Sequence, residues 1–237
     1  DDDINLAVAI LNTRYNDIFN YYFILDTITR HANDDWYEVD YDLQSDFEQW
    51  EEDMRSQTAI DPIHHYNIWS TNLDHSPADD DGYIYQINGW NYFPDDSPES
   101  SYWQGTTIHA PTVIEDNWFD DQGTLPHEAG HYLLLYHTFQ GGCNGSNDYV
   151  SDTPAMHQDS TYSSCSQEHD SCPQSPGLDP VSNIMNYSDC NVDFTPGQAE
   201  RAYAATNTYH PGLLENEYPY PNLYFSSFSF SNDSDGD

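Results

Sequence analysis

The first half of the chain alternates between helical and strand-like patterns of apolar residues. Two segments, 4–18 and 42–57, repeat apolar residues at the spacing of one helix face, which predicts amphipathic helices. The first face consists of Ile4, Ala7, Val8, Leu11, Tyr15 and Ile18, and the second of Leu43, Phe47, Trp50 and Met54. Strands are predicted in four segments with β-branched and aromatic residues: 21–28, 65–71, 83–87 and 106–113. This half is therefore expected to be a mixed layer of helices and a sheet.

Beyond position 137 the periodicity gives way to Gly, Asn, Ser, Asp and Pro. Such a composition predicts an irregular segment, which continues to about residue 195. A helix is then expected over 195–206, because Thr195 fits an N-cap, Pro196 suits the first turn and Gln198 completes a capping box.

The 237 residues are enough for a single domain with a sizeable core. We expect this domain to span 1–237, with an N-terminal lobe over 1–131, an irregular C-terminal lobe over 132–215 and a tail or linker over 216–237. The tail is rich in Pro, Tyr and Ser, and its aromatic residues fit either a last strand or a linker. These residues are Phe225, Phe228 and Phe230.

The charge of the chain is extreme, with 42 Asp and Glu against four Arg and no Lys, a net charge of −38. Such a surface repels nucleic acid and anionic membranes. The mean hydropathy of −0.82 and the lack of a long apolar run also argue against membrane insertion. Adaptation to high salt is the preferred explanation, because salt screens the repulsion; a low-pH habitat or a cationic substrate are the alternatives. No basic segment with an apolar run opens the sequence, so we expect a mature form from which any pro-segment was removed.

The segment His127-Glu128-Ala129-Gly130-His131 arranges two imidazoles and a carboxylate in five residues. On a helix the two histidines stand one turn apart on the same face and can bind one Zn²⁺. His137 supplies a third imidazole, but an unbroken helix would rotate it by about 240° away from the others. The helix is therefore expected to break after His131.

Three imidazoles leave the fourth tetrahedral position of zinc to water, as in catalytic sites. Structural zinc is normally closed by four protein ligands, so the pattern favours catalysis. The alternative is that the three histidines are ordinary buried residues with structural hydrogen bonds.

Four cysteines follow the histidine segment between positions 143 and 190, with no C-x-x-C pair among them. An even number in an irregular region predicts two disulfides formed in an oxidising compartment. Spacing alone leaves three pairings open, and four buried thiols are the alternative.

Four strings of the sequence resemble the pappalysin (cytophagalysin) family of metzincin metalloproteases. They are HEAGHYLLLYHTFQGGC at 127–143, DTPA at 152–155, DPVSNIMNYSDC at 179–190 and FTPGQAER at 194–201. With the upstream order of helices and strands, the resemblance covers nearly the whole chain. It implies an α+β fold of the metzincin zincin type, with a mixed sheet in the N-terminal lobe and an irregular disulfide-linked C-terminal lobe.

The resemblance also implies residue roles. It makes His127, His131 and His137 the zinc ligands and Glu128 the general base and acid. Met185 falls at the family's Met-turn under the metal, and the Tyr187 hydroxyl is expected near the zinc, where it helps to stabilise an oxyanion. Asp189 would belong to the substrate pocket, although the family's Asp-Asp-x-Cys is shortened here, which leaves a preference for basic side chains in doubt.

Three further expectations come from the resemblance. The family's cysteine order implies Cys143 with Cys172 and Cys165 with Cys190. Asp148, Asp152 and Thr153 offer oxygen ligands for Ca²⁺, which relatives bind near this region. Leu134 occupies a turn position where the family usually has Gly, so either the turn differs or Leu adopts a left-handed conformation at a cost of about 1–2 kcal/mol.

The chain is thus expected to be a secreted zinc-dependent endopeptidase that hydrolyses protein or peptide substrates. Two other classes stay open. One is a non-catalytic metal-binding adhesion or interaction module on a metallopeptidase scaffold, and the other is an acidic calcium-binding structural protein.

Overall fold

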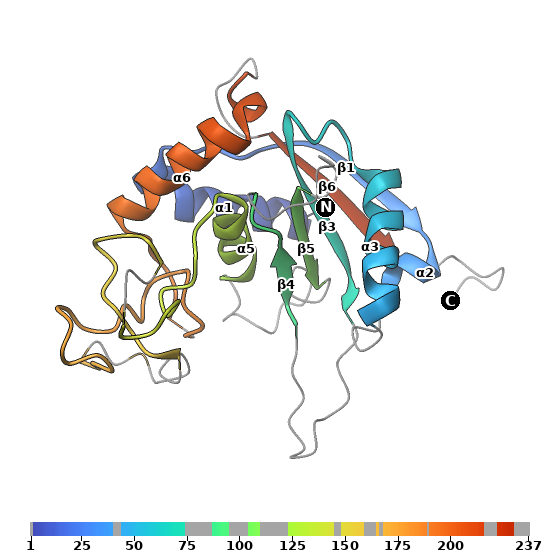
Figure 1. Cartoon of the computed structure of the whole chain (residues 1–237). Coiled ribbons are helices and arrows are strands. Elements are labelled where there is room, and N and C mark those ends of the chain that lie inside the picture. Colours follow the sequence, from blue (N-terminus) through green and yellow to red (C-terminus); the bar gives the residue numbers. More distant parts are fainter. Residues whose placement is uncertain are drawn as a thin grey trace.

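Figure 1 shows the fold of the chain in a computed structural model. The structure describes residues 2–39, 44–73, 87–94, 104–109, 123–144, 148–158, 165, 168–188, 190–215 and 222–229. Its helices are α1 (Asp2–Phe19), α2 (Asp34–Tyr37), α3 (Gln44–Thr58), α5 (Thr124–Tyr132), α6 (Pro196–Tyr209) and the 3-10 helix η3 (Pro211–Leu214). Its strands are β1 (Ile24–Ala32), β2 (Glu38–Val39), β3 (His65–Leu73), β4 (Gly89–Asn91), β5 (Gly105–His109) and β6 (Asn222–Ser229).

The strands form one sheet with the order β1-β6-β3-β5-β4, and β2 pairs with β3 off this path. All neighbours in the main path are parallel except β4, which runs antiparallel to β5 at one edge. β6 comes from the far end of the sequence, yet it pairs with β1 on one side and β3 on the other. The C-terminal strand β6 therefore lies inside the sheet, between the N-terminal edge strand β1 and β3.

Helices cover both faces of the sheet, as Figure 1 shows, with α3 on one side and α1 and α5 on the other. Successive side chains of a strand point to opposite faces of the sheet, so β3 contributes side chains to the cores on both faces. Tyr66 and Ile68 belong to the larger core with residues of α1, α5 and α6. Trp69 packs with Met54 of α3 and Trp36 of α2 in a smaller core.

The predicted helices are confirmed, with small shifts of their ends. The first predicted helix is α1, whose buried residues include Leu11 and Tyr15, whereas Ile18 is exposed. The second is α3, with Met54 buried. The last is α6, and Thr195 and Gln198 form the predicted capping box at its start.

The strand predicted over 65–71 is confirmed as β3, and the described part of the one predicted over 106–113 is β5. The strand expected over 21–28 is β1, which begins at Ile24 because Tyr21 and Phe23 instead enter the core ahead of it. The predictions over 83–87 and 110–113 lie outside the described residues apart from Ile87. In the predicted tail or linker, residues 222–229 form β6 inside the sheet, which makes this part a strand of the domain.

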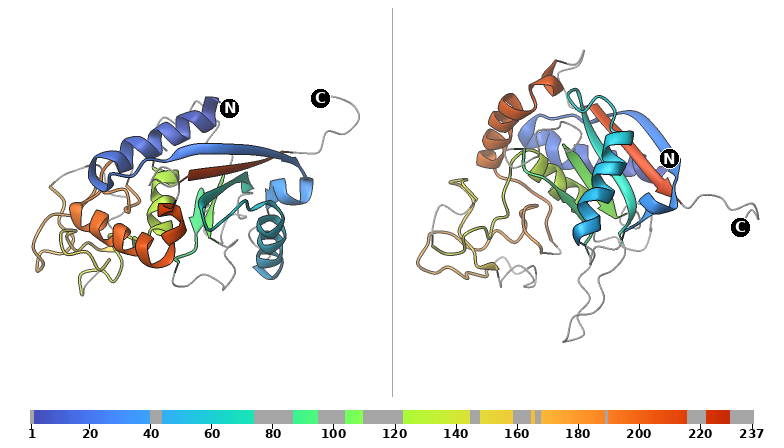
Figure 2. Two further views of the ribbon diagram at one scale, coloured as in Figure 1. Left: turned by 90° about the horizontal axis from the view of Figure 1, so that it is seen from above. Right: turned by 45° about the vertical axis from the view of Figure 1, so that its right-hand side comes forward.

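The segment between α5 and α6 contains few regular elements in its described part, as expected for the C-terminal lobe. Both views of Figure 2 place it beside α1, α5 and α6, away from α3. Disulfides join Cys143 to Cys172 and Cys165 to Cys190, the pairing that the resemblance implied. Among the described helices, none combines the length and the apolarity that a membrane crossing needs.

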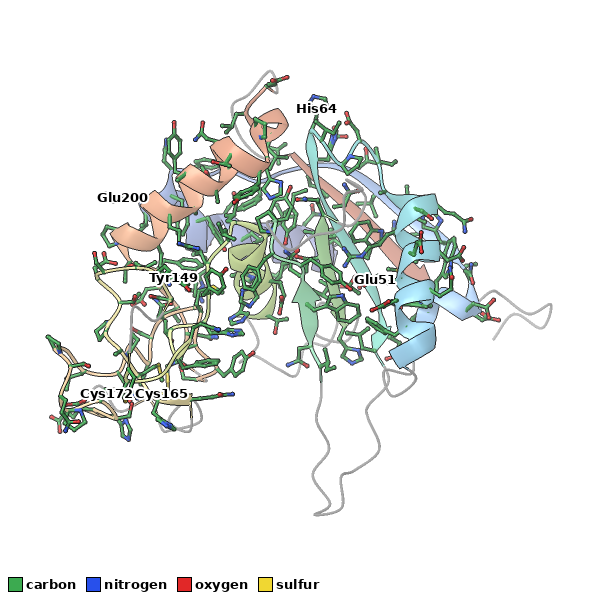
Figure 3. All side chains as sticks on the ribbon, viewed as in Figure 1. Glu51, His64, Tyr149, Cys165, Cys172 and Glu200 are labelled. Carbon is green, nitrogen blue, oxygen red and sulfur yellow. A yellow bond between two sulfur atoms is a disulfide. The ribbon has the colours of Figure 1, made fainter. Side chains whose placement is uncertain are left out.

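A buried ion pair connects α3 to the sheet. Glu51 and Arg55 are both fully buried, and their charged groups lie 2.6 Å apart. Arg55 also donates to the Gly105 carbonyl and the Thr107 hydroxyl of β5, at 3.1 and 2.9 Å. Figure 3 shows Glu51 on the side of α3 that faces the strands.

The carboxylate of Glu51 accepts two further hydrogen bonds. One comes from the Trp90 indole of β4 at 2.7 Å and the other from the Tyr92 hydroxyl at 2.6 Å. The pair therefore ties the edge strand β4 and its neighbour β5 to the helix on the outer face of the sheet.

Glu51→Ala is expected to lower the free energy of unfolding by about 3–5 kcal/mol, because it leaves the Arg55 guanidinium buried without its carboxylate. Chemical denaturation would measure the loss. Glu52→Ala, at an exposed position of the same helix, is the matched control and should change stability by less than about 0.5 kcal/mol. Equal effects of the two substitutions would contradict the importance assigned to the buried pair.

Candidate metal centre

α5 carries His127, Glu128 and His131, and all three side chains are buried. The Nδ1 atom of His127 donates to the Ile184 carbonyl at 2.7 Å, and that of His131 donates to the Leu135 carbonyl at 2.8 Å. A carbonyl can only accept, so both imidazoles carry their proton on Nδ1. Their Nε2 lone pairs are left for a metal ion.

α5 ends at Tyr132, which confirms the break predicted after His131. The ending has the hydrogen bonds of a Schellman motif, from Leu135 N to the Gly130 carbonyl at 2.8 Å and from Leu134 N to the His131 carbonyl at 2.9 Å. Leu134 occupies the left-handed position of this motif with a φ of 65°. The turn thus keeps its left-handed geometry without Gly, at a cost of about 1–2 kcal/mol.

The turn brings His137 back to the other two histidines. Its Nε2 lies 3.1 Å from Nε2 of both His127 and His131. Two ligands of a tetrahedral zinc with bonds of about 2.0–2.1 Å would be separated by roughly 3.3 Å, so the three atoms fit this ion. Within the described ranges this is the one group of at least three His, Cys, Asp or Glu side chains placed to hold a metal.

Burial keeps these imidazoles neutral. It lowers the pKa of His127 to about 4 and that of His137 to about 3, and it places the pKa of His131 well below its usual value. Only the neutral imidazole can donate a lone pair to a metal. The three side chains are therefore ready to bind an ion at neutral pH without first losing a proton.

Met185 packs against the backbone of α5 between the two histidines of the helix. The side chain is fully buried, and a Cβ atom added to Gly130 would collide with its sulfur. Gly130 is therefore required by the close approach of Met185. The local sequence pattern does not predict this role of Gly130, because it does not reveal which side chain crosses the helix there.

Tyr187 lies beside the three nitrogen atoms. Its hydroxyl is 3.0 Å from Nε2 of His137, and 43% of the side chain is exposed. The hydroxyl therefore stands at the solvent side of the ligand set. Asp189, predicted to line the substrate pocket, lies outside the described residues.

Glu128 faces the edge strand of the sheet. A Cβ atom added to Gly89 of β4 would lie 3.2 Å from Cγ of Glu128 and 3.0 Å from the Thr107 carbonyl. A side chain at position 89 would press on the carboxylate and on β5. Glycine here lets β4 pass close to the buried carboxylate.

The residues considered for calcium have other partners. The two carboxylate oxygens of Asp152 accept hydrogen bonds from the Thr195 hydroxyl at 2.7 Å and the Gly197 N–H at 2.8 Å, at the start of α6. The Thr153 hydroxyl donates to Asp148 at 2.8 Å. Burial raises the pKa of Asp148 to about 6. This arrangement explains the three residues as supports of the loop and of α6, and gives calcium no support.

Comparison of the sequence with protein families identifies the family of this chain. Residues 57–207 match the peptidase M43 family, described as pregnancy-associated plasma protein-A. This chain belongs to the M43 family. The match spans the whole histidine segment and the capping box of α6, and it confirms the pappalysin resemblance.

Curated relatives are extracellular metalloproteases of fungi. That of Pyricularia oryzae is 49% identical over 120 residues, which are 48% of this chain and 42% of the relative. That of Neurospora crassa is 44% identical over 128 residues, 51% of this chain and 44% of the relative. The matched segments thus span less than half the length of these relatives.

Solved structures of mirolysin from Tannerella forsythia share the fold. Mature mirolysin, in complex with a cleaved peptide, matches with a TM-score of 0.69 and 23% identity over 93% of this chain and 92% of that chain. Mirolysin in complex with compound 9 has a TM-score of 0.52 and 27% identity over 69% and 62% of the two chains. The expected α+β fold of the metzincin type is thereby confirmed.

The C-terminal end of α5 is covered by a buried histidine. The ring of His210 stacks on that of Tyr132 with centroids 4.1 Å apart, and its Nε2 donates to the Tyr132 carbonyl at 3.0 Å. Burial lowers the pKa of His210 to about 4. The unfolded chain, with an ordinary pKa of about 6.5, therefore binds this proton more readily than the folded one.

His210 is expected to make the fold less stable as the pH falls from about 6.5 to about 4, by up to about 3 kcal/mol over that window. His210→Gln should remove this part of the pH dependence, while the three clustered histidines contribute equally in both proteins. Urea denaturation at several pH values would measure the difference. Asn207→Gln, exposed on α6, is the control, and parallel curves for all three proteins would contradict the assignment.

Proposed function

We propose that this chain is the catalytic domain of a secreted zinc-dependent endopeptidase and that the domain extends over residues 1–237. The observation that carries the proposal is the meeting of three neutral imidazoles next to the buried Glu128. Nε2 of His137 lies 3.1 Å from Nε2 of both His127 and His131. Three protein ligands leave one position open for reacting groups. Membership of the M43 family and the extracellular metalloproteases among its relatives support the same activity.

The proposed mechanism assigns one task to each group. Zinc held at this site supplies Lewis-acid polarisation of the scissile carbonyl and lowers the pKa of water. Glu128 accepts the proton of the attacking water and delivers it to the leaving amine. The Tyr187 hydroxyl donates a hydrogen bond to the oxyanion of the tetrahedral intermediate.

The proposed substrates are internal peptide bonds of proteins and peptides. Asp189 is proposed to favour a basic side chain after the scissile bond, because a carboxylate attracts a cation in a pocket. Secretion is consistent with the two disulfides, which persist in oxidising compartments.

Glu128→Gln is expected to lower kcat by about 100- to 10,000-fold, because the amide cannot accept the proton of water. Zinc content should stay at that of the parent, since the three imidazoles are unchanged. Cleavage of a peptide mixture, read by mass spectrometry with and without a zinc chelator, would measure this. Glu168→Gln, at an exposed position, is the control for loss of a carboxylate.

Two outcomes would contradict the proposal. A Glu128→Gln variant with near-parent turnover would refute the assigned base. Zinc-loaded, folded parent protein that cleaves no peptide over a range of salt concentrations would favour the metal-binding interaction module instead.

We further propose that the domain is adapted to high salt, since its 42 acidic residues face only four arginines. The repulsion between exposed carboxylates is screened as the Debye length falls from about 10 Å at 0.1 M to about 3 Å at 1 M salt. The midpoint of thermal unfolding is therefore expected to rise between 0.1 and 1 M NaCl. Calorimetry would measure the midpoint, and an unchanged midpoint in NaCl would reject the adaptation.

A further inference from the structure

α6 contacts both backbone turns that orient the histidines of α5. The carbonyls that accept from His127 and His131 belong to Ile184 and Leu135, which lie outside α5. Gln198 and Arg201 of α6 reach the neighbours of these two residues. The two side chains are three residues apart and share one face of the helix.

Gln198 holds the turn that contains Ile184. Its side chain is fully buried, and its amide exchanges two hydrogen bonds with that of Asn183, at 2.8 and 3.0 Å. The Gln198 oxygen also accepts from Thr195 N at 2.9 Å, and the Asn183 oxygen from Met185 N at 3.0 Å. Because backbone N–H groups can only donate, these contacts fix which amide atom is oxygen and which is nitrogen.

The Gln198–Asn183 pair acts on His127 through Ile184, the residue next to Asn183. Asn183 and Met185 flank Ile184, whose carbonyl accepts from His127 Nδ1 at 2.7 Å and whose N–H donates to the Asp193 carbonyl at 2.8 Å. The Gln198–Asn183 pair thus fixes the place of this carbonyl relative to α6.

Arg201 holds the other turn. Its Nε donates to the Leu134 carbonyl at 2.7 Å, and its guanidinium lies 5.1 Å from the ring centre of Tyr136 and 5.5 Å from that of Tyr149. Leu134 is the left-handed residue of the Schellman motif. The next carbonyl, that of Leu135, accepts from His131 Nδ1 at 2.8 Å.

We propose that Gln198 and Arg201 are positioning residues of the metal centre. By fixing the two turns, they keep the Ile184 and Leu135 carbonyls where each accepts an Nδ1 proton, so that both Nε2 lone pairs point to one ion. This inference rests on the proposed zinc site and adds that the ligand set is held from α6. Loss of such supporting contacts typically weakens metal affinity by about 10- to 100-fold.

The test compares four variants with the parent: two Met substitutions, the matched control and the conservative Arg201→Lys. Gln198→Met removes the amide at similar volume, and Arg201→Met removes the donor while keeping the aliphatic stem. Glu200→Gln, on the outer face of α6 in Figure 3, is the matched control. The zinc dissociation constant is measured by competition with a chromogenic chelator, and the visible spectrum of the Co²⁺ form reports ligand geometry.

Both Met variants are expected to bind zinc about 10- to 100-fold more weakly and to change the Co²⁺ spectrum, while Glu200→Gln matches the parent. Arg201→Lys should recover part of the affinity, because an ammonium can donate to the Leu134 carbonyl. A merely structural role would instead lower the unfolding temperature and leave the zinc dissociation constant and the spectrum unchanged.

Folded variants with parent affinity and spectrum would overturn the inference. If Gln198→Met fails to fold, the Arg201 variants still test the inference. Equal zinc affinities of Arg201→Lys, Arg201→Met and the parent would then be enough to overturn it. A parent protein that binds no zinc would refute the proposed function itself, so the two failures are distinguishable.

Discussion

The metal centre depends on where α5 stops. Three imidazoles can meet at one point only if the chain leaves the helix between His131 and His137, because each helical residue turns the next by about 100°. The Schellman motif provides this exit and forces Leu134 into the left-handed region. The strain is compensated by the buried neighbours Leu133 and Leu135 and by the bond from Arg201 to the turn. The strained turn at Leu134 is therefore the same feature that brings His137 to the other two histidines.

Two of the few basic residues of this acidic chain connect separate elements of the fold. Of the four arginines, Arg55 is fully buried beside Glu51, and Arg201 lies over two tyrosine rings next to the metal turn. Each guanidinium combines a charge with directed hydrogen bonds and ring contacts, which an ammonium reproduces poorly. The described fold thus uses cations as internal connectors between elements that are distant in sequence.

Much of the site was predictable from local sequence, because its residues lie close together in the chain. The spacing of His127, His131 and His137 was enough to predict that the three side chains come together and that the helix ends after His131. Gln198 was recognised as a capping residue, but its bond to Asn183 joins two segments 15 residues apart and leaves no local trace. For the same reason the sequence did not single out Glu51 and Arg55, since their burial arises only when α3 packs on the sheet.

The local sequence was also insufficient to predict β6. Its short aromatic pattern fits a strand or a linker, and only pairing with β1 and β3 distinguishes the two. Its position between β1 and β3 also bears on the rate of folding. The ribosome delivers residues 222–229 after every other described element, and β1 and β3 pair with them rather than with each other. Parallel pairing across so long a separation closes a large loop before any contact rewards it, and topologies rich in such contacts fold slowly. Until β6 is in place, β1 and β3 each have an unpaired backbone edge that could pair with another chain. The high negative charge opposes such association between copies.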